Sequence, residues 1–252
     1  MNLRSPSSIS AVAYLRTLAV VMALVFSANC FAQDPPLVPR TVFDAPAEHD
    51  FVTISPDGKS IAYTAPSNKG VANIWVEDLA THQKRMVTRA GQRGISGYQW
   101  SYDNQHLLYQ SDENGNEDFH LYSVDLRTSA IRDLTPFLGI RSEQVLLTAT
   151  HPGEVLVGMN LRDSKLFDVY RVDLETGTTV MDAQNPGDVI GWTADQNLVV
   201  RAATAFNNNL ETVVRVRDSG KAPWRELLKI PFEQAPFLGQ VNGGNIIVGF
   251  SQ

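Results

Sequence analysis

One short segment concentrates side chains that can hold a positively charged group. Residues 112–118 read Asp-Glu-Asn-Gly-Asn-Glu-Asp, so four carboxylates fall within seven residues. Such a cluster creates a local negative field that attracts a cation, for example the free α-amino group of a peptide. Two other interpretations stay open. The segment also fits a solvated Asn-Gly hairpin tip, or a calcium loop, although its donor spacing differs from that of an EF-hand.

Other residue types with catalytic potential do not combine into a site. The five histidines form no His-x-x-x-His or His-Glu-x-x-His pair, and the only cysteine is Cys30. No Gly-x-Ser-x-Gly nucleophile elbow occurs, because the nearest string, Gly-Ile-Ser-Gly at 94–97, lacks the spacing. Gly243 and Gly244 are not followed by a phosphate-binding Lys-Ser/Thr. The sequence therefore predicts no catalytic residue, metal or cofactor for this chain alone.

Composition narrows the class of protein. The chain has 252 residues, of which 43% are hydrophobic, which is enough to build a core. Its formal net charge is −6, and its basic residues form no cluster. A nucleic-acid partner is not expected, because binding to phosphates depends on clustered Lys and Arg.

The first 32 residues differ from the rest. Arg4 and Arg16 are their only charges, and the apolar run at 18–26 is too short to span a bilayer. This pattern predicts a secretory signal peptide at 1–32, cleaved after Ala32, and hence a periplasmic or secreted protein with no membrane segment after cleavage. A lipoprotein signal using Cys30 is the alternative. Residues 33–50 contain Pro35, Pro36 and Pro39, and we expect an extended lead-in there.

A sequence motif, called the repeated phrase below, recurs along the remaining chain. The first copy has Ser-Pro-Asp-Gly-Lys-Ser-Ile-Ala-Tyr at 55–63 and ends in an aromatic-rich strand closed by Asp78. Aligned positions in the first strand of the phrase fall at 61, 107, 155, 198 and 246, and the closing aspartates at 78, 125, 173 and 218. Two independent landmarks thus keep a period of 43 to 48 residues. A period of that size with about four strands per unit is typical of propeller blades.

The elements expected from this period are all strands. We predict an all-β fold, a partial β-propeller of about four and a half four-stranded blades over 51–252, with little helix. The expected strands are 51–54, 60–65, 73–79 and 84–88; 97–100, 106–111, 119–126 and 130–134; 144–149, 154–159, 167–174 and 178–181; 189–192, 198–203, 212–217 and 225–230; then 237–241 and 245–250. Trp75, Trp100 and Trp192 are expected as core anchors between sheets, with Trp224 partly exposed.

Two of these segments resemble a known family. Residues 55–63 resemble the blade motif of the translocation protein TolB and of prolyl oligopeptidase-type serine peptidases. Residues 109–126, Tyr-Gln-Ser-Asp-Glu-Asn-Gly-Asn-Glu-Asp-Phe-His-Leu-Tyr-Ser-Val-Asp-Leu, are more specific. They resemble the second blade of secreted bacterial members of that peptidase family, in the acylaminoacyl-peptidase and dipeptidyl-aminopeptidase branch.

The resemblance implies a function. Such enzymes join a propeller to an α/β-hydrolase domain with a Ser-Asp-His triad, and this chain contains no match to that domain. The expected role is therefore non-catalytic: gating or positioning peptide substrates for a hydrolase domain absent from this chain. Related aminopeptidases use propeller glutamates to hold the substrate amino group, so Glu113, Asn114 and Glu117 are the implied substrate-binding residues.

Two further expectations belong to the whole chain. The alternative function is a TolB-like periplasmic propeller that binds proteins. An open ring of blades would leave apolar sheet faces and a strand edge uncovered, so the isolated chain is expected to self-associate or aggregate.

Overall fold

The structure is a computed structural model that describes residues 49–112, 115–231, 236–238 and 248–250. The predicted signal peptide at 1–32 and nearly all of the predicted lead-in at 33–50 lie outside the described residues, and these segments stay predictions. Within the described ranges the chain forms strands and turns and no helix. None of the described segments, accordingly, is a helix of the length and apolarity needed to cross a membrane.

Sixteen of the strands form four antiparallel sheets, each with its strands in chain order. Blade 1 contains β1 (Asp50–Ile54), β2 (Ser60–Pro66), β3 (Ala72–Asp78) and β4 (Lys84–Met86). Blade 2 contains β5 (Tyr98–Trp100), β6 (His106–Ser111), β7 (His120–Asp125) and β8 (Ile131–Asp133). Blade 3 contains β9 (Ser142–Leu146), β10 (Glu154–Asp163), β11 (Leu166–Asp173) and β12 (Thr179–Ala183). Blade 4 contains β13 (Val189–Ala194), β14 (Val200–Phe206), β15 (Thr212–Val216) and β16 (Arg225–Ile230).

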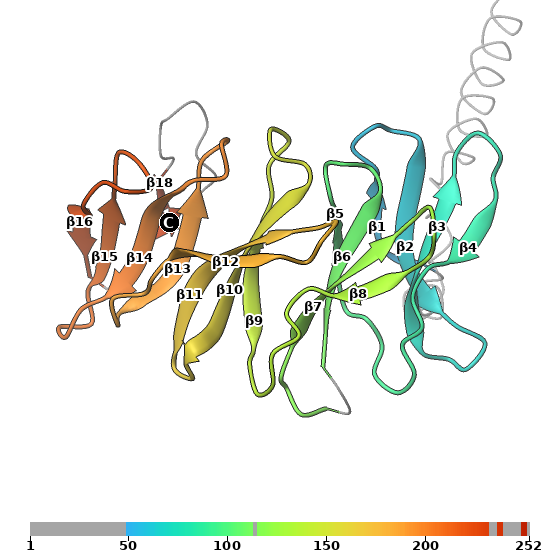
Figure 1. The fold of residues 1–252 in the computed structure, drawn as a ribbon, viewed down its shortest axis with the longest axis horizontal. Helices are drawn as coiled ribbons and strands as arrows, with labels where there is room; N and C mark the ends of the chain where they lie inside the picture. The colour runs from blue at the N-terminus through green and yellow to red at the C-terminus, as the bar shows by residue number, and fades with distance from the viewer. Residues whose placement is uncertain (1–48, 113–114, 232–235, 239–247, 251–252) are drawn as a thin grey trace, which may run out of the picture. The chain divides into compact units, whose positions relative to one another are not determined.

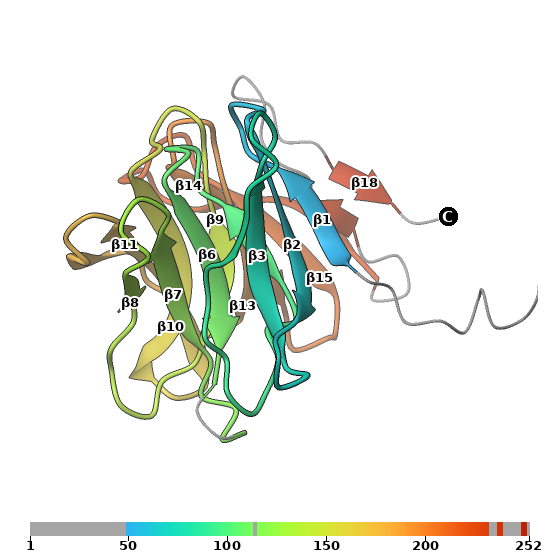
Figure 2. The same ribbon diagram turned by 90° about the vertical axis from the view of Figure 1, so that its right-hand side faces the viewer.

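The four sheets follow one another in chain order (Figure 1), and Figure 2 views them from the side of blade 1. A two-stranded sheet of β17 (Pro236–Leu238) and β18 (Val248–Phe250) stands where a half blade was predicted. The prediction of an all-β fold built from four-stranded blades is thus confirmed for the described part of the chain.

The core lies between the blades. One cluster joins Ile74 of blade 1 to Leu107 of blade 2, a second joins Leu108 to Val157 of blade 3, and a third joins Leu156 to blade 4. The middle strands are therefore apolar on both faces, because each sheet packs against a neighbour on either side. Each fully buried leucine contributes about 1.5–3 kcal/mol to this packing.

The closing aspartates of the repeat have a structural role. Asp78, Asp125 and Asp173 each lie at the turn between the third and fourth strand of a blade, and each Oδ1 accepts backbone N–H groups of that turn. The shortest of these bonds are 2.7 Å, from Arg127 to Asp125 and from Thr176 to Asp173. Asp218 differs, because its carboxylate is exposed and lies 3.6 Å from Arg225. The repeated aspartate thus marks a side-chain-stabilised turn.

Turns between the first and second strands link consecutive blades. The Asp57 amide donates to Asn104 Oδ1 at 2.9 Å, and Ser101 Oγ donates to the Pro152 carbonyl at 2.9 Å. A third bond of this kind, between blades 3 and 4, joins the Thr150 hydroxyl to the Gln196 carbonyl. The Ser-Asp phrase that defines the repeat therefore also ties one blade to the next.

Two predictions about single elements need correction. Trp100 and Trp192 are buried as expected, but Trp75 is only half-buried. It belongs to none of the core clusters found in the described residues, and its buried indole N–H has no hydrogen-bond partner there, so Trp75 is no core anchor. Blade 4 also starts its second strand later than predicted, at Val200. Leu198 instead adopts a φ of +53° inside a turn whose amides bond to Asp195.

Candidate functional site

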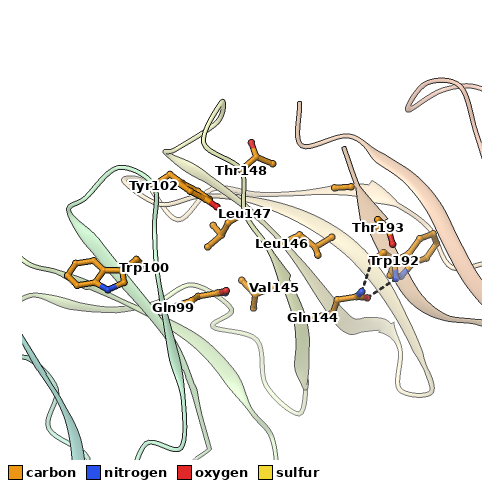
Figure 3. A pocket seen from close by; sticks show the side chains of 11 residues that line it. Gln99, Trp100, Tyr102, Gln144, Val145, Leu146, Leu147, Thr148, Trp192 and Thr193 are labelled. Atoms are coloured by element: carbon orange, nitrogen blue, oxygen red, sulfur yellow. Dashed lines mark hydrogen bonds between the residues drawn. The ribbon is translucent and has the colours of Figure 1, made fainter. Parts of the chain in front are cut away.

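The inner strands of blades 2, 3 and 4 enclose a cavity of about 450 Å³ (Figure 3). Residues of β5, of β9 with the turn that follows it, and of β13 form its wall. Its lining consists of Gln99, Trp100, Tyr102, Gln144, Val145, Leu146, Leu147, Thr148, Trp192, Thr193 and Ala194. The volume falls in the range of clefts that take small ligands, about 300–1,000 Å³.

Gln144 shapes this wall. It has a φ of +50° and forms a bulge in β9, because the ladder to β10 pairs Val145 with Val157 and then Glu143 with Gly158. The bulge turns the Gln144 side chain toward the next blade. There its Nε2 donates to the Trp192 carbonyl at 2.5 Å, and its Oε1 accepts from the Trp192 amide at 2.9 Å. One glutamine side chain thus binds both main-chain groups of a strand residue.

The two tryptophans of the wall are held by their ring nitrogens. Trp100 Nε1 donates to Thr53 Oγ1 at 3.1 Å, and Trp192 Nε1 donates to the Phe167 carbonyl at 3.1 Å. Satisfying each indole N–H inside the protein removes the cost of burying it unpaired. Both rings are therefore fixed parts of the wall.

A second cavity of about 300 Å³ adjoins the first and shares Gln99 and Val145 with it. Tyr98 lies at this end of the wall. Its hydroxyl donates to the Phe51 carbonyl at 2.6 Å and accepts from Thr53 Oγ1. Burial raises the pKa of Tyr98, so its phenol stays neutral at physiological pH. The two neighbouring cavities, together called the inner groove, are lined in the described residues by no charged side chain.

The acidic hairpin lies in the turn between β6 and β7. Glu113 and Asn114 lie outside the described residues, and Glu117 is exposed with a φ of +64°. The Asp112 side chain is 2% exposed, and its carboxylate accepts from Arg93 Nη1 at 2.8 Å and from the Glu117 amide at 3.1 Å. Burial acts to raise the pKa of Asp112, but these hydrogen bonds outweigh it and hold that pKa below its ordinary value. One of the hairpin's four carboxylates is thus neutralised by an arginine of the preceding loop.

The rest of the hairpin contributes to a separate cavity of about 290 Å³. Asn116 and Asp118 line it together with His120, whose Nδ1 lies 2.7 Å from Asp133 Oδ2. The structure does not place Glu117 in the lining of the inner groove. Among the described residues, no three His, Cys, Asp or Glu side chains are grouped so as to hold a metal ion.

Sequence reasoning missed the inner groove. The residues that line its larger cavity lie in, or just after, the first strands of blades 2, 3 and 4, whereas the period was derived from the second and third strands. Gln99 and Gln144 carry no motif of their own. Gln99 directly precedes the Trp100-Ser101 of the repeated phrase, but Gln144 is followed by Val145 and Leu146 and carries no such signal.

Comparison with known proteins finds relatives of the chain in sequence and in structure. No known family profile matches it. It is 37% identical over 198 residues to dipeptidyl aminopeptidase BIII of Pseudoxanthomonas mexicana, an alignment that covers 78% of this chain and 28% of that protein. The chain thus spans well under a third of the length of this relative.

Solved structures bear on the fold alone, since their identity to the chain is low. The β-propeller domain of the Trilobed protease from Pyrococcus furiosus matches with a TM-score of 0.55 at 17% identity, over 81% of this chain and 64% of that one. TolB from Acinetobacter baumannii matches with a TM-score of 0.50 at 21% identity, over 73% of this chain and 44% of that one.

The sequence relative and the blades agree with the resemblance of residues 55–63 and 109–126. The chain therefore belongs to the prolyl oligopeptidase family, and the part of it that the structure describes is a β-propeller of that family.

Proposed function

We propose that this propeller gates or positions peptide substrates for an α/β-hydrolase domain that the present 252 residues do not contain. The observation that carries the proposal is the 37% identity over 198 residues to a protein named as a dipeptidyl aminopeptidase. The chain itself has no Gly-x-Ser-x-Gly string, so peptide hydrolysis requires residues from elsewhere.

The position of the acidic hairpin supports this role. Successive strands of a blade alternate in direction, so the turn between β6 and β7 lies at the end of blade 2 where β5 begins. The groove reaches that end through Ser96 and Tyr98. In this proposal Glu113, Asn114 and Glu117 hold the α-amino group of a peptide whose chain enters there. The uncharged groove then accommodates the rest of the peptide.

The proposed compartment is the periplasm or the exterior of the cell. It rests on the residues at 1–32, whose charged start and apolar run have the pattern of a secretory signal. The mature chain would then begin at Gln33. N-terminal sequencing of the protein isolated from its source tests this, and a protein that still carries Met1 contradicts it.

The gene itself provides the direct test of the domain arrangement. We expect the reading frame to continue beyond Gln252 and to encode a Gly-x-Ser-x-Gly string between a strand and a helix. A frame that continues without this string, or that closes at Gln252, contradicts the proposal.

A TolB-like protein-binding propeller is the second candidate. The blade motif at 55–63 fits it equally well, and the fold of TolB matches with a TM-score of 0.50. Affinity purification from the source separates the two. Recovery of a stoichiometric envelope protein together with no peptidase activity favours the second candidate.

A further inference from the structure

We propose that the groove along β5, β9 and β13 binds a neutral, extended stretch of peptide main chain, and that the Gln99 side-chain amide recognises it. The inference deepens the proposed function, on which it rests for its biological meaning. It names the part of a peptide that this wall contacts and the residue that makes the contact.

The Gln99 side chain carries an unused hydrogen-bonding group. In Figure 3 the Gln99 side chain points from β5 across the cavity toward Val145. Within the described residues its amide forms no hydrogen bond, whereas Gln110 and Gln144, at the same wall, both do. Gln99 is half-buried and lines the cavity beside Val145 and Trp100, so its amide is available to pair with a ligand there.

Pairing of a glutamine amide with a peptide main chain already occurs within this protein. The Gln144 side chain pairs with both the N–H and the C=O of Trp192, which belongs to a strand of the next blade. A side-chain amide carries one acceptor and two donors and so complements any extended residue in this way. Gln99 offers the same pair of groups to the open cavity, where no strand of the described chain occupies them.

The absence of charge in the lining of the described cavities favours a neutral ligand. The net charge of the chain is −6, yet the lining of both cavities contains only uncharged residues. Besides the glutamine amides and the tryptophan N–H groups, the polar side chains there carry hydroxyls, and those of Tyr102 and Thr193 form no hydrogen bond with another described residue. A phosphate, a carboxylate or an ammonium group would lose its hydration in this groove without meeting an opposite charge. A neutral main-chain segment loses far less, and its side chains can contact Trp100 and Trp192.

Binding to the chain itself tests this inference. The probe is tetra-alanine acetylated at its N-terminus and amidated at its C-terminus, titrated calorimetrically into the purified chain. We expect the capped peptide to bind, because the groove recognises the main chain and not the termini. Gln99→Leu keeps most of the side-chain volume but removes the paired hydrogen bonds. It should weaken binding about tenfold.

Two further variants complete the design. Gln92→Leu changes an exposed glutamine of the loop before Ile95, and it should bind as the unmodified chain does. Thr193→Val removes one hydroxyl of the wall with little change of shape and should weaken binding severalfold. It serves as the test if Gln99→Leu fails to fold. Circular dichroism of each variant provides the control for folding.

Several results would overturn the inference: no binding by the unmodified chain, equal affinity in folded Gln99→Leu, or binding that capping abolishes. None of them requires hydrolysis, so they are distinct from a failure of the proposed function. A full-length protein that releases dipeptides equally well with Gln99→Leu would refute the role of Gln99 alone.

Discussion

The carboxylate of Asp125 explains at the scale of one residue why the repeat ends in aspartate. It accepts the amides of Arg127 and Thr128 and contacts the Arg127 guanidinium at 3.2 Å. The hydrogen bond from the Arg127 side chain is the largest of the effects that lower the pKa of Asp125 to about 2, below its ordinary value of 3.8. The charged carboxylate therefore stabilises the folded turn through its hydrogen bonds.

The lowered pKa of Asp125 predicts a dependence of stability on pH. Because the folded-state pKa lies below the unfolded one, the stabilisation is complete above about pH 4 and is lost as the pH falls toward 2. In Asp125→Asn this contribution is missing. We expect a lower unfolding temperature than the unmodified chain at pH 6, and a smaller further drop between pH 6 and pH 2.5. Thermal melts followed by circular dichroism measure both.

Asp218 supplies the matched control, since its exposed carboxylate only approaches Arg225 at 3.6 Å. Asp218→Asn should reproduce the pH profile of the unmodified chain. If Asp125→Asn showed that same profile, the carboxylate of Asp125 would have no part in the stability of the turn.

At the scale of the element, two buried threonines fasten the outer strands to their blades. Thr88 Oγ1 accepts from the Ile74 amide at 2.8 Å, and Thr135 Oγ1 accepts from the Leu121 amide at 2.9 Å. Both hydroxyls lie directly beyond a fourth strand of only three residues, β4 or β8. Side-chain bonds thus extend a ladder that the backbone alone ends early.

Thr135→Val tests this fastening. The change leaves the buried amide of Leu121 without its partner, and an unsatisfied buried donor costs about 1–3 kcal/mol. We expect a loss of unfolding free energy of that size in denaturant titrations. Thr128→Val alters an exposed threonine of the adjacent turn, and it should change stability by about 0.5 kcal/mol or less. Equal stability of the two variants would show that the hydroxyl of Thr135 is dispensable.

The strands themselves were largely predictable from the period. The observed bounds of β6 and β16 equal the predicted ones, because clear turn residues flank both strands. The prediction for β9 was shifted by two residues at its start, since the bulge at Gln144 gives no signal in the alternation of side chains. The prediction that Trp75 is a core anchor was wrong for a similar reason. The period places a residue in a blade, but it does not say how deeply neighbouring residues bury its side chain.

The groove was less accessible to sequence reasoning than the strands. Its larger cavity is lined by residues in, or just after, the first strands of three blades, and their adjacency depends on the stacking of whole sheets. The bulge in β9 directs the Gln144 amide to its two bonds with Trp192, whereas the Gln99 amide has no partner within the described part of the chain. No pattern of residue types distinguishes these two glutamines.

At the scale of the whole molecule, the first strand of blade 1 exposes an apolar surface. Phe51, Val52 and Ile54 are 63%, 57% and 60% exposed, whereas the middle strands of every blade are buried. Contiguous apolar side chains on a strand at the end of a sheet favour association with other chains.

We therefore expect the isolated chain to self-associate. Replacing Phe51 and Ile54 by serine should lower the mass measured by size-exclusion chromatography with light scattering toward that of a monomer. Leu210→Ser, at an exposed turn of blade 4, should leave the mass unchanged. A monomeric unmodified chain at all concentrations would contradict the expectation.

The release of dipeptides by the full-length protein isolated from its source tests the central claim most directly. Mass spectrometry of an unblocked peptide incubated with this protein should show its residues leaving two at a time from the N-terminus, with cleavage abolished by a serine-directed inhibitor. A pure, folded full-length protein that leaves the peptide intact would contradict the proposed role of this propeller in positioning peptides for a hydrolase domain.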